Sequence, residues 1–213
     1  KRKKNLFIIA IIGGSALLAD SIITPSITVV SAVEGLQMIE PNVHIILIAL
    51  IIITVLFFLQ QFGTAFIGKS FGPIMFIWFS TIGILGATNM VVMPEMLKAF
   101  NPWYAIHLLV HYPSGFLLLG AVFLCTTGAE ALYADLGHCG LHNIRTSWVF
   151  VKVMLILNYL GQGAWVLRHA GEMRPGINPF FEIMPSWFLP FGVLLATMAA
   201  VIASQALISG SYT

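Results

Sequence analysis

Long apolar runs are the feature that most constrains how this 213-residue chain can fold. A helix rises about 1.5 Å per residue, so about 20 consecutive apolar residues cross the hydrocarbon of a bilayer. Six segments meet this test: roughly 6–36, 43–67, 72–93, 115–137, 147–168 and 187–209. Charged residues make up only 8% of the chain, against about 25% in soluble domains. The sequence therefore predicts an all-α integral membrane protein, with residues 1–213 forming a single transmembrane domain.

The basic residues predict how these helices are oriented. If the amino end is cytoplasmic, seven of the ten Lys and Arg fall on the inside, among them the cluster at 1–4. We therefore expect both ends to be cytoplasmic. Segment 94–113 predicts short interfacial helices, and Trp148, Trp165 and Trp187 near span ends predict an aromatic belt. The net charge of +2 gives no reason to expect a nucleic-acid partner.

Polar residues interrupt the fourth apolar segment. Thr126, Thr127, Gly128 and Glu130 follow a clean apolar run, and a buried carboxylate in hydrocarbon is expensive. Gly128 beside β-branched Thr127 is a weak point in a helix, so we expect a broken helix near Thr127–Gly128. Opened backbone carbonyls, hydroxyls and Glu130 would suit a weakly hydrated monovalent cation. The alternative is that Glu130 hydrogen-bonds a neighbouring helix and only fastens the bundle.

The first apolar segment also carries a carboxylate. Asp20 and Thr24 are four residues apart and share a helix face, and Pro25 cannot donate to the Ser21 carbonyl. These oxygens could complete a cage with the residues near Thr127. The alternative is a proline kink in which Asp20 pairs structurally. Glu34, near the outer end of the segment, is either an entrance charge or a residue at the water interface.

Other polar residues inside spans do not point to a single role. Asn158, Tyr159 and Gln162 could support the ion-binding residues, although interhelical hydrogen bonding is the simpler role. On the last span, Ala196, Ala200 and Ser204, with Ala199 and Ala203 beside them, form a stripe of small residues that favours close helix packing.

No motif predicts an enzyme. Residues 68–72 match G-x-S-x-G, but membrane helices flank them instead of the strand and helix that a nucleophile elbow requires. There is no H-E-x-x-H zinc motif, and no histidine falls in mid-span. An intramembrane enzyme using Glu130, Asp20 and a histidine is therefore disfavoured. We expect no enzymatic activity and no cofactor.

The chain resembles the Kup/HAK/KT family of potassium uptake permeases. The resemblance rests on ordered motifs over nearly the whole chain: 20–25 with 31–35, 60–64 with 71–75, 126–138, 157–164, 178–181 and 203–206. The family usually has Gly where Ser21 stands and often Phe where Cys139 stands. The serine at position 21 would stiffen the helix beside Asp20, and the departure at Cys139 touches no expected potassium ligand.

This resemblance implies a LeuT-type inverted-repeat fold of the amino acid–polyamine–organocation (APC) superfamily, of which the chain would be a fragment covering the third to eighth membrane helices. It implies potassium uptake across the plasma membrane, here the bacterial inner membrane, coupled to protons. Rubidium and caesium would be analogues of potassium. A homodimer of the full-length protein is compatible with it.

The family's ion-pathway residues correspond here to Asp20, Thr24, Thr127 and Glu130. Potassium would contact Thr24, Thr127 and Glu130, with Asp20 adding charge, and Asp20 or Glu130 would carry the coupling proton. Two alternatives stay open for the function. One is an amino-acid or other solute permease of the same fold, and the other is a cation channel.

Overall fold

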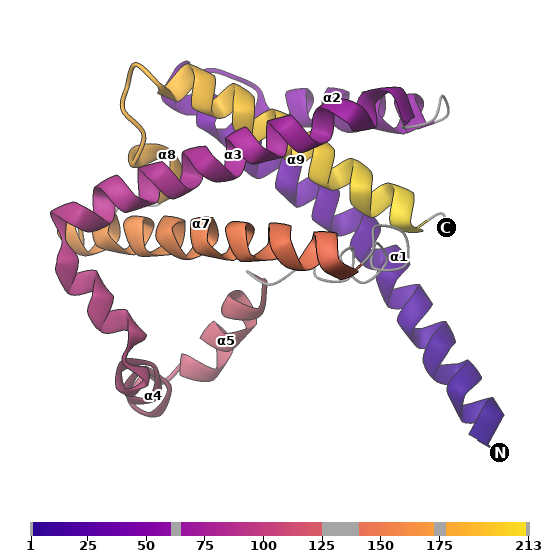
Figure 1. Ribbon diagram of the computed structural model, residues 1–213, viewed down its shortest axis with the longest axis horizontal. Coiled ribbons are helices and arrows are strands. Elements are labelled where there is room, and N and C mark those ends of the chain that lie inside the picture. The colour runs from indigo at the N-terminus through magenta and orange to yellow at the C-terminus, as the bar shows by residue number, and fades with distance from the viewer. Residues whose placement is uncertain (1, 61–64, 125–140, 173–177, 212–213) are drawn as a thin grey trace. The chain divides into compact units, whose positions relative to one another are not determined.

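All regular secondary structure in the described part of the chain is helical. Figure 1 shows the computed structural model, which describes residues 2–60, 65–124, 141–172 and 178–211. Its elements, in chain order, are α1 (Arg2–Glu34), η1 (Gly35–Met38), α2 (Ile45–Gln60), α3 (Ala65–Val92), η2 (Pro94–Phe100), α4 (Pro102–His111), α5 (Gly115–Leu124), α7 (Leu141–Arg168), α8 (Pro179–Glu182) and α9 (Leu189–Ser211).

Four of these helices are long and apolar enough to cross a membrane. The qualifying stretches are Ile11–Met38, Ser70–Val92, Ile144–Arg168 and Leu189–Ile208. A helix satisfies its own backbone hydrogen bonds, which is what a segment surrounded by lipid requires. For the described residues, the prediction of an all-helical integral membrane protein is therefore confirmed. That all 213 residues form one six-helix domain stays a prediction.

The bounds of two helices differ from the expected spans. The third span was expected to begin at residue 72, but α3 begins at Ala65 and carries Pro73 inside it. A proline removes one intrahelical hydrogen bond without necessarily ending a membrane helix, so the Gly72–Pro73 pair is not a helix start. The second span was expected to reach residue 67, but residues 65–67 belong to α3; the described residues of α2 are Ile45–Gln60, and 61–64 lie outside the described part of the chain.

The chain divides into two compact units, and each is described by itself. Unit 1 holds residues 1–78 and 184–213, and unit 2 holds residues 79–183. In unit 1, α1 packs against both α9 and α2. Val29 and Val33 of α1 share a buried cluster with Ala49 of α2. These contacts fix the amino-terminal helix, which carries Asp20, against its neighbours.

Small residues of α9 are buried, as the stripe predicted. Ala196, Ala199 and Ala200 lie in the core of unit 1, and Ser204 is buried with them. Ala203 is exposed, which corrects its place in the stripe.

In unit 2, α3 and α7 cross with their backbones in contact. A β-carbon on Gly86 would lie 2.2 Å from the carbonyl oxygen of Leu157. Asn89 of α3 joins three segments: Arg168 Nη2 donates to its Oδ1 at 3.3 Å, and its Nδ2 faces the Ile183 oxygen at 3.5 Å. The glycines permit the close approach, and the polar groups then tie the ends of the helices together.

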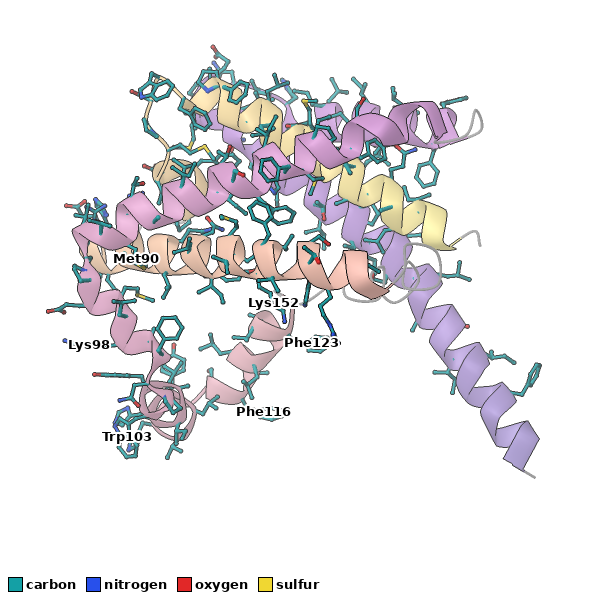
Figure 2. The ribbon with its side chains drawn as sticks, viewed as in Figure 1. Met90, Lys98, Trp103, Phe116, Phe123 and Lys152 are labelled. Atoms are coloured by element: carbon teal, nitrogen blue, oxygen red, sulfur yellow. The ribbon has the colours of Figure 1, made fainter. Side chains whose placement is uncertain are left out.

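The two short helices expected between residues 94 and 113 are present as η2 and α4. Figure 2 labels Trp103 on α4 and Phe116 on α5, and the Phe116 side chain is 83% exposed. Exposed aromatic side chains on short helices are typical of a membrane interface. Trp165 departs from the expected belt, because it is buried and stacks on His169 with ring centroids 4.4 Å apart.

Candidate functional site

The centre of the candidate site is a hydrogen bond inside α1. The Thr24 hydroxyl donates to Asp20 Oδ1 at 2.6 Å, and both side chains are half-buried. Residues four apart in a helix lie one above the other, so the sequence spacing alone accounts for the contact. The prediction that Asp20 and Thr24 share one helix face is confirmed. A helix that is apolar enough to span a membrane therefore carries a carboxylate and a hydroxyl in direct contact.

This arrangement leaves oxygen lone pairs for a cation. A hydroxyl that donates its hydrogen keeps two acceptor lone pairs, and a carboxylate has more acceptor sites than one donor can fill. Asp20 Oδ2 is buried and has no hydrogen-bond partner among the described residues. The pair can therefore offer oxygen atoms and negative charge without first breaking the Thr24–Asp20 bond.

The backbone around Pro25 adds a further oxygen. Pro25 lies inside α1 and has no N–H, so it cannot donate to the Ser21 carbonyl one turn earlier. The carbonyl of Thr24, by contrast, accepts the Thr28 hydroxyl at 2.7 Å. Sequence reasoning did not single out Thr28. Its signal was the four-residue spacing that continues the series from Asp20 through Thr24.

The second half of the predicted site lies outside the described residues. Thr126, Thr127 and Glu130 all fall in 125–140, as does the break expected near Thr127–Gly128. The described residues before them form helix α5, Gly115–Leu124. The potassium ligand set that joins Thr24 to Thr127 and Glu130 stays a prediction.

The remaining candidates occupy different places in the fold. Glu34 is half-buried at the end of α1, where its side chain makes no capping hydrogen bond to η1. Asn158 is 6% exposed at the crossing of α3 and α7, with its Oδ1 unpaired among the described residues. A β-carbon on Gly86 would lie 2.6 Å from the Asn158 Cα. Gln162, one turn along α7, is half-buried, and Tyr159 is exposed.

These positions separate the candidates into two groups. Asp20, Thr24 and Glu34 belong to unit 1, whereas Asn158 and Gln162 belong to unit 2. The backbone contact of the two helices beside Asn158 favours a role in helix packing. A role of Asn158, Tyr159 or Gln162 in the ion pathway stays a prediction.

Two buried polar residues of α9 deserved more weight than sequence reasoning gave them. Ser204 and Gln205 are 1% and 3% exposed, and Ser204 Oγ and Gln205 Nε2 have no partner among the described residues. Their sequence signal was weak, because a serine in a stripe of alanines predicts helix packing and no further role. Their burial depends on the packing of α9 against α1, which the sequence does not specify.

Comparison with known proteins relates the whole chain to potassium transporters. A protein from Cytophaga hutchinsonii named "Probable potassium transport system protein Kup" is 58% identical over 218 residues, covering 100% of this chain and 33% of that protein. A protein of the same name from Flavobacterium johnsoniae is 57% identical over 216 residues, covering 98% of this chain and 33% of its own length. The chain thus spans about a third of the length of the curated relatives it matches. No solved structure matches it.

The match to a protein family covers the whole sequence. Residues 1–213 align with the family described as "K+ potassium transporter integral membrane domain". The described helices agree with that description, since four of them are long and apolar enough to cross a membrane. The chain therefore belongs to the family of K+ potassium transporter integral membrane domains.

Proposed function

We propose that this chain is part of a transporter that takes up potassium across the plasma membrane, coupled to protons. The observation that carries the proposal is the Thr24–Asp20 hydrogen bond of 2.6 Å in a membrane-spanning helix. Ionisable residues within membrane helices are costly and typically line ion or proton pathways. Family membership names potassium as the ion to test first.

The chemistry of the pair suits potassium. Potassium sites in membrane proteins replace the hydration shell of the ion with protein oxygens. Thr24 supplies a hydroxyl oxygen, Asp20 supplies charge, and the proposal adds Thr127 and Glu130 from the residues that follow α5. An amino-acid substrate would bring its own carboxylate, which Asp20 and Glu130 would repel. This repulsion favours a cation over the solute-permease alternative.

Proton coupling needs a carboxyl group that can exchange its proton while potassium is bound elsewhere. Asp20 and Glu130 are the two candidates, and the one farther from the ion is the better carrier, because a bound cation disfavours a proton beside it. We propose a LeuT-type fold with the amino end cytoplasmic. The distribution of Lys and Arg supports that orientation.

The test is rubidium uptake by the full-length protein in liposomes, with and without an inward proton gradient. We expect uptake that requires the gradient and is suppressed by excess potassium. Uptake that ignores the gradient would contradict symport and favour a channel. Competition by amino acids but not by potassium would favour a solute permease.

A further inference from the structure

Two histidines lie one turn apart on α4, a helix of unit 2 in which no residue is buried. The rings of His107 and His111 stack with their centroids 4.1 Å apart and their planes inclined by 14°. Residues four apart in a helix share one face, so the spacing itself brings the rings together. Two nitrogen donors of the kind that transition metals prefer therefore meet at one place on an exposed helix.

A hydrogen bond determines which nitrogen of His111 is available. Its Nδ1 lies 3.0 Å from the backbone carbonyl oxygen of His107. A carbonyl only accepts hydrogen bonds, so Nδ1 carries the hydrogen, and in the neutral ring Nε2 keeps its lone pair. Metal-binding histidines are held in the same way, because their other ring nitrogen almost always donates to a carbonyl, a carboxylate or water. The backbone of α4 thus already orients His111 as a metal ligand.

The ring of His107 can turn toward the same ion. The lone pairs of two parallel rings run side by side, so one metal ion contacts both nitrogens only after a ring rotates. The His107 ring makes no hydrogen bond to another described residue, and it lies beside Trp103 with ring centroids 6.4 Å apart. The last side-chain torsion of histidine has a broad energy minimum, so this rotation costs little.

The helix that carries the pair is fixed at both ends. At its start, the Asn101 side chain accepts a hydrogen bond from the Trp103 backbone nitrogen at 3.0 Å, which is an N-cap. Near its end, a β-carbon on Gly115 of α5 would lie 3.0 Å from the Leu109 Cα, so α5 begins against the backbone of this turn. A turn that is already ordered loses little further freedom when a ligand binds to it.

We propose that His107 and His111 form a binding site for a divalent transition metal ion such as Zn²⁺. Imidazole nitrogens bind zinc at about 2.0–2.1 Å, and two histidines four apart on one helix face recur in zinc sites. No group of three or more His, Cys, Asp or Glu among the described residues could hold a metal ion. Water therefore completes the coordination, and the ion exchanges with solvent. The site uses none of the residues of the proposed function and does not depend on it.

The site is tested by titrating Zn²⁺ into the full-length protein in lipid nanodiscs and measuring the heat of binding. Mildly alkaline pH favours the neutral imidazole that metals bind. We expect His107→Gln and His111→Gln each to weaken the binding of one Zn²⁺ by about tenfold or more, because even the loss of a partner outside the ligand shell costs about 10–100-fold in affinity. Equal zinc affinity in the wild type and in both variants, or no zinc binding by the wild type, would overturn the proposal.

His169 of α7 supplies a matched control. Its Nδ1 lies 2.9 Å from the Trp165 carbonyl oxygen, and its ring stacks on Trp165 with centroids 4.4 Å apart. The local bond is the same as that of His111, but the indole one turn earlier has only an N–H donor and cannot bind a metal ion. His169→Gln should therefore leave zinc affinity unchanged. A loss of zinc affinity in His169→Gln as large as that in His111→Gln would contradict a site specific to α4.

A second control keeps two histidines on α4 and changes only their spacing. Ile106→His combined with His107→Gln places the histidines five residues apart, on different faces of the helix. Ile106 is 53% exposed, so the helix can accommodate the change. Zinc should raise the unfolding midpoint of the wild type but not that of this variant, because a ligand stabilises the state that binds it. An equal rise in both proteins would show binding by separate histidines and overturn the shared site.

Discussion

Gly161 of α7 lies directly against Gly86 of α3, and a β-carbon on Gly161 would be 2.4 Å from the Cα of Gly86. Real β-carbons essentially never approach other atoms within 3.0 Å, and here the obstacle is backbone, which cannot rotate away as a side chain does. Close crossings of this kind are built on small residues in membrane proteins, where the packing of helices itself drives their association. The crossing of α3 and α7 therefore depends on glycine at both positions, because each carries a hydrogen atom where alanine would carry a methyl group.

The first prediction concerns this crossing. Gly161→Ala should destabilise the full-length protein by about 1–3 kcal/mol, because overpacking forces the helices apart. Gly120→Ala on α5 is the matched control, since nothing lies within 4 Å of its β-carbon position. Alanine there should be neutral or mildly stabilising, by up to about 1 kcal/mol. Thermal unfolding in detergent measures the stability of both variants. Equal unfolding midpoints for Gly161→Ala and Gly120→Ala would contradict the backbone contact between α3 and α7.

The second prediction concerns Thr24. Thr24→Val keeps the shape of the side chain but removes the donor to Asp20 Oδ1 and one proposed potassium ligand. Hydrogen bonds to charged groups contribute about 1.5–3 kcal/mol, so we expect the half-saturation concentration for rubidium to rise by about tenfold or more.

The control for Thr24 lies two residues away. Ser26 donates only to the Ile22 oxygen of its own helix, at 2.9 Å, so Ser26→Ala should leave uptake within about twofold of the wild type. If Thr24→Val lowers only the yield of folded protein and leaves the half-saturation concentration unchanged, Thr24 has a structural role alone.

The third prediction concerns Glu130, which lies outside the described residues. Glu130→Gln in the full-length protein should abolish concentrative uptake of rubidium while membrane insertion stays intact, because the amide keeps the size of the side chain and removes its charge. Uptake is measured in liposomes and insertion by extraction and size-exclusion profile. Accumulation at the wild-type level would remove Glu130 from the proposed site.

The fourth prediction concerns Asn89, which joins α3 to Arg168 and to the Ile183 backbone. Asn89→Leu should lower the free energy of unfolding by about 1–3 kcal/mol, because it leaves the partner groups without their hydrogen bonds. Thr88→Val is the neighbouring control, since Thr88 donates only to the Leu85 oxygen of its own helix. Thermal unfolding midpoints that shift equally for both variants would show that the link across helices contributes nothing.

The local parts of this fold could be predicted because their causes are local. Apolar length alone predicts a membrane helix, and the four-residue spacing of Asp20 and Thr24 alone predicts their contact. The predicted start of the third span at residue 72 was wrong, because α3 continues through Pro73: a proline removes one hydrogen bond, and the other hydrogen bonds keep the helix intact.

Partner choice could not be predicted in the same way. Glycines such as Gly161 permit close packing of helices, but nothing in the sequence identifies Gly86 as the residue that Gly161 meets. For Ser204 the sequence predicts packing and for Gln205 interhelical hydrogen bonding, but it identifies no partner for either, since burial depends on which helix covers them. A stripe of small residues indicates that a helix surface is buried. Only the packed structure identifies the helix that covers it, here α1 over α9.

The Thr24–Asp20 hydrogen bond closes within a little more than one turn of a single helix. Its length is set by the pitch of α1 and not by any neighbouring segment, so the whole helix can rock or translate without changing it. In a transporter that alternates between outward-open and inward-open states, these two oxygens would therefore keep one spacing throughout the cycle. Any difference in potassium affinity between the states must then come from the groups that other helices bring to this pair or withdraw from it.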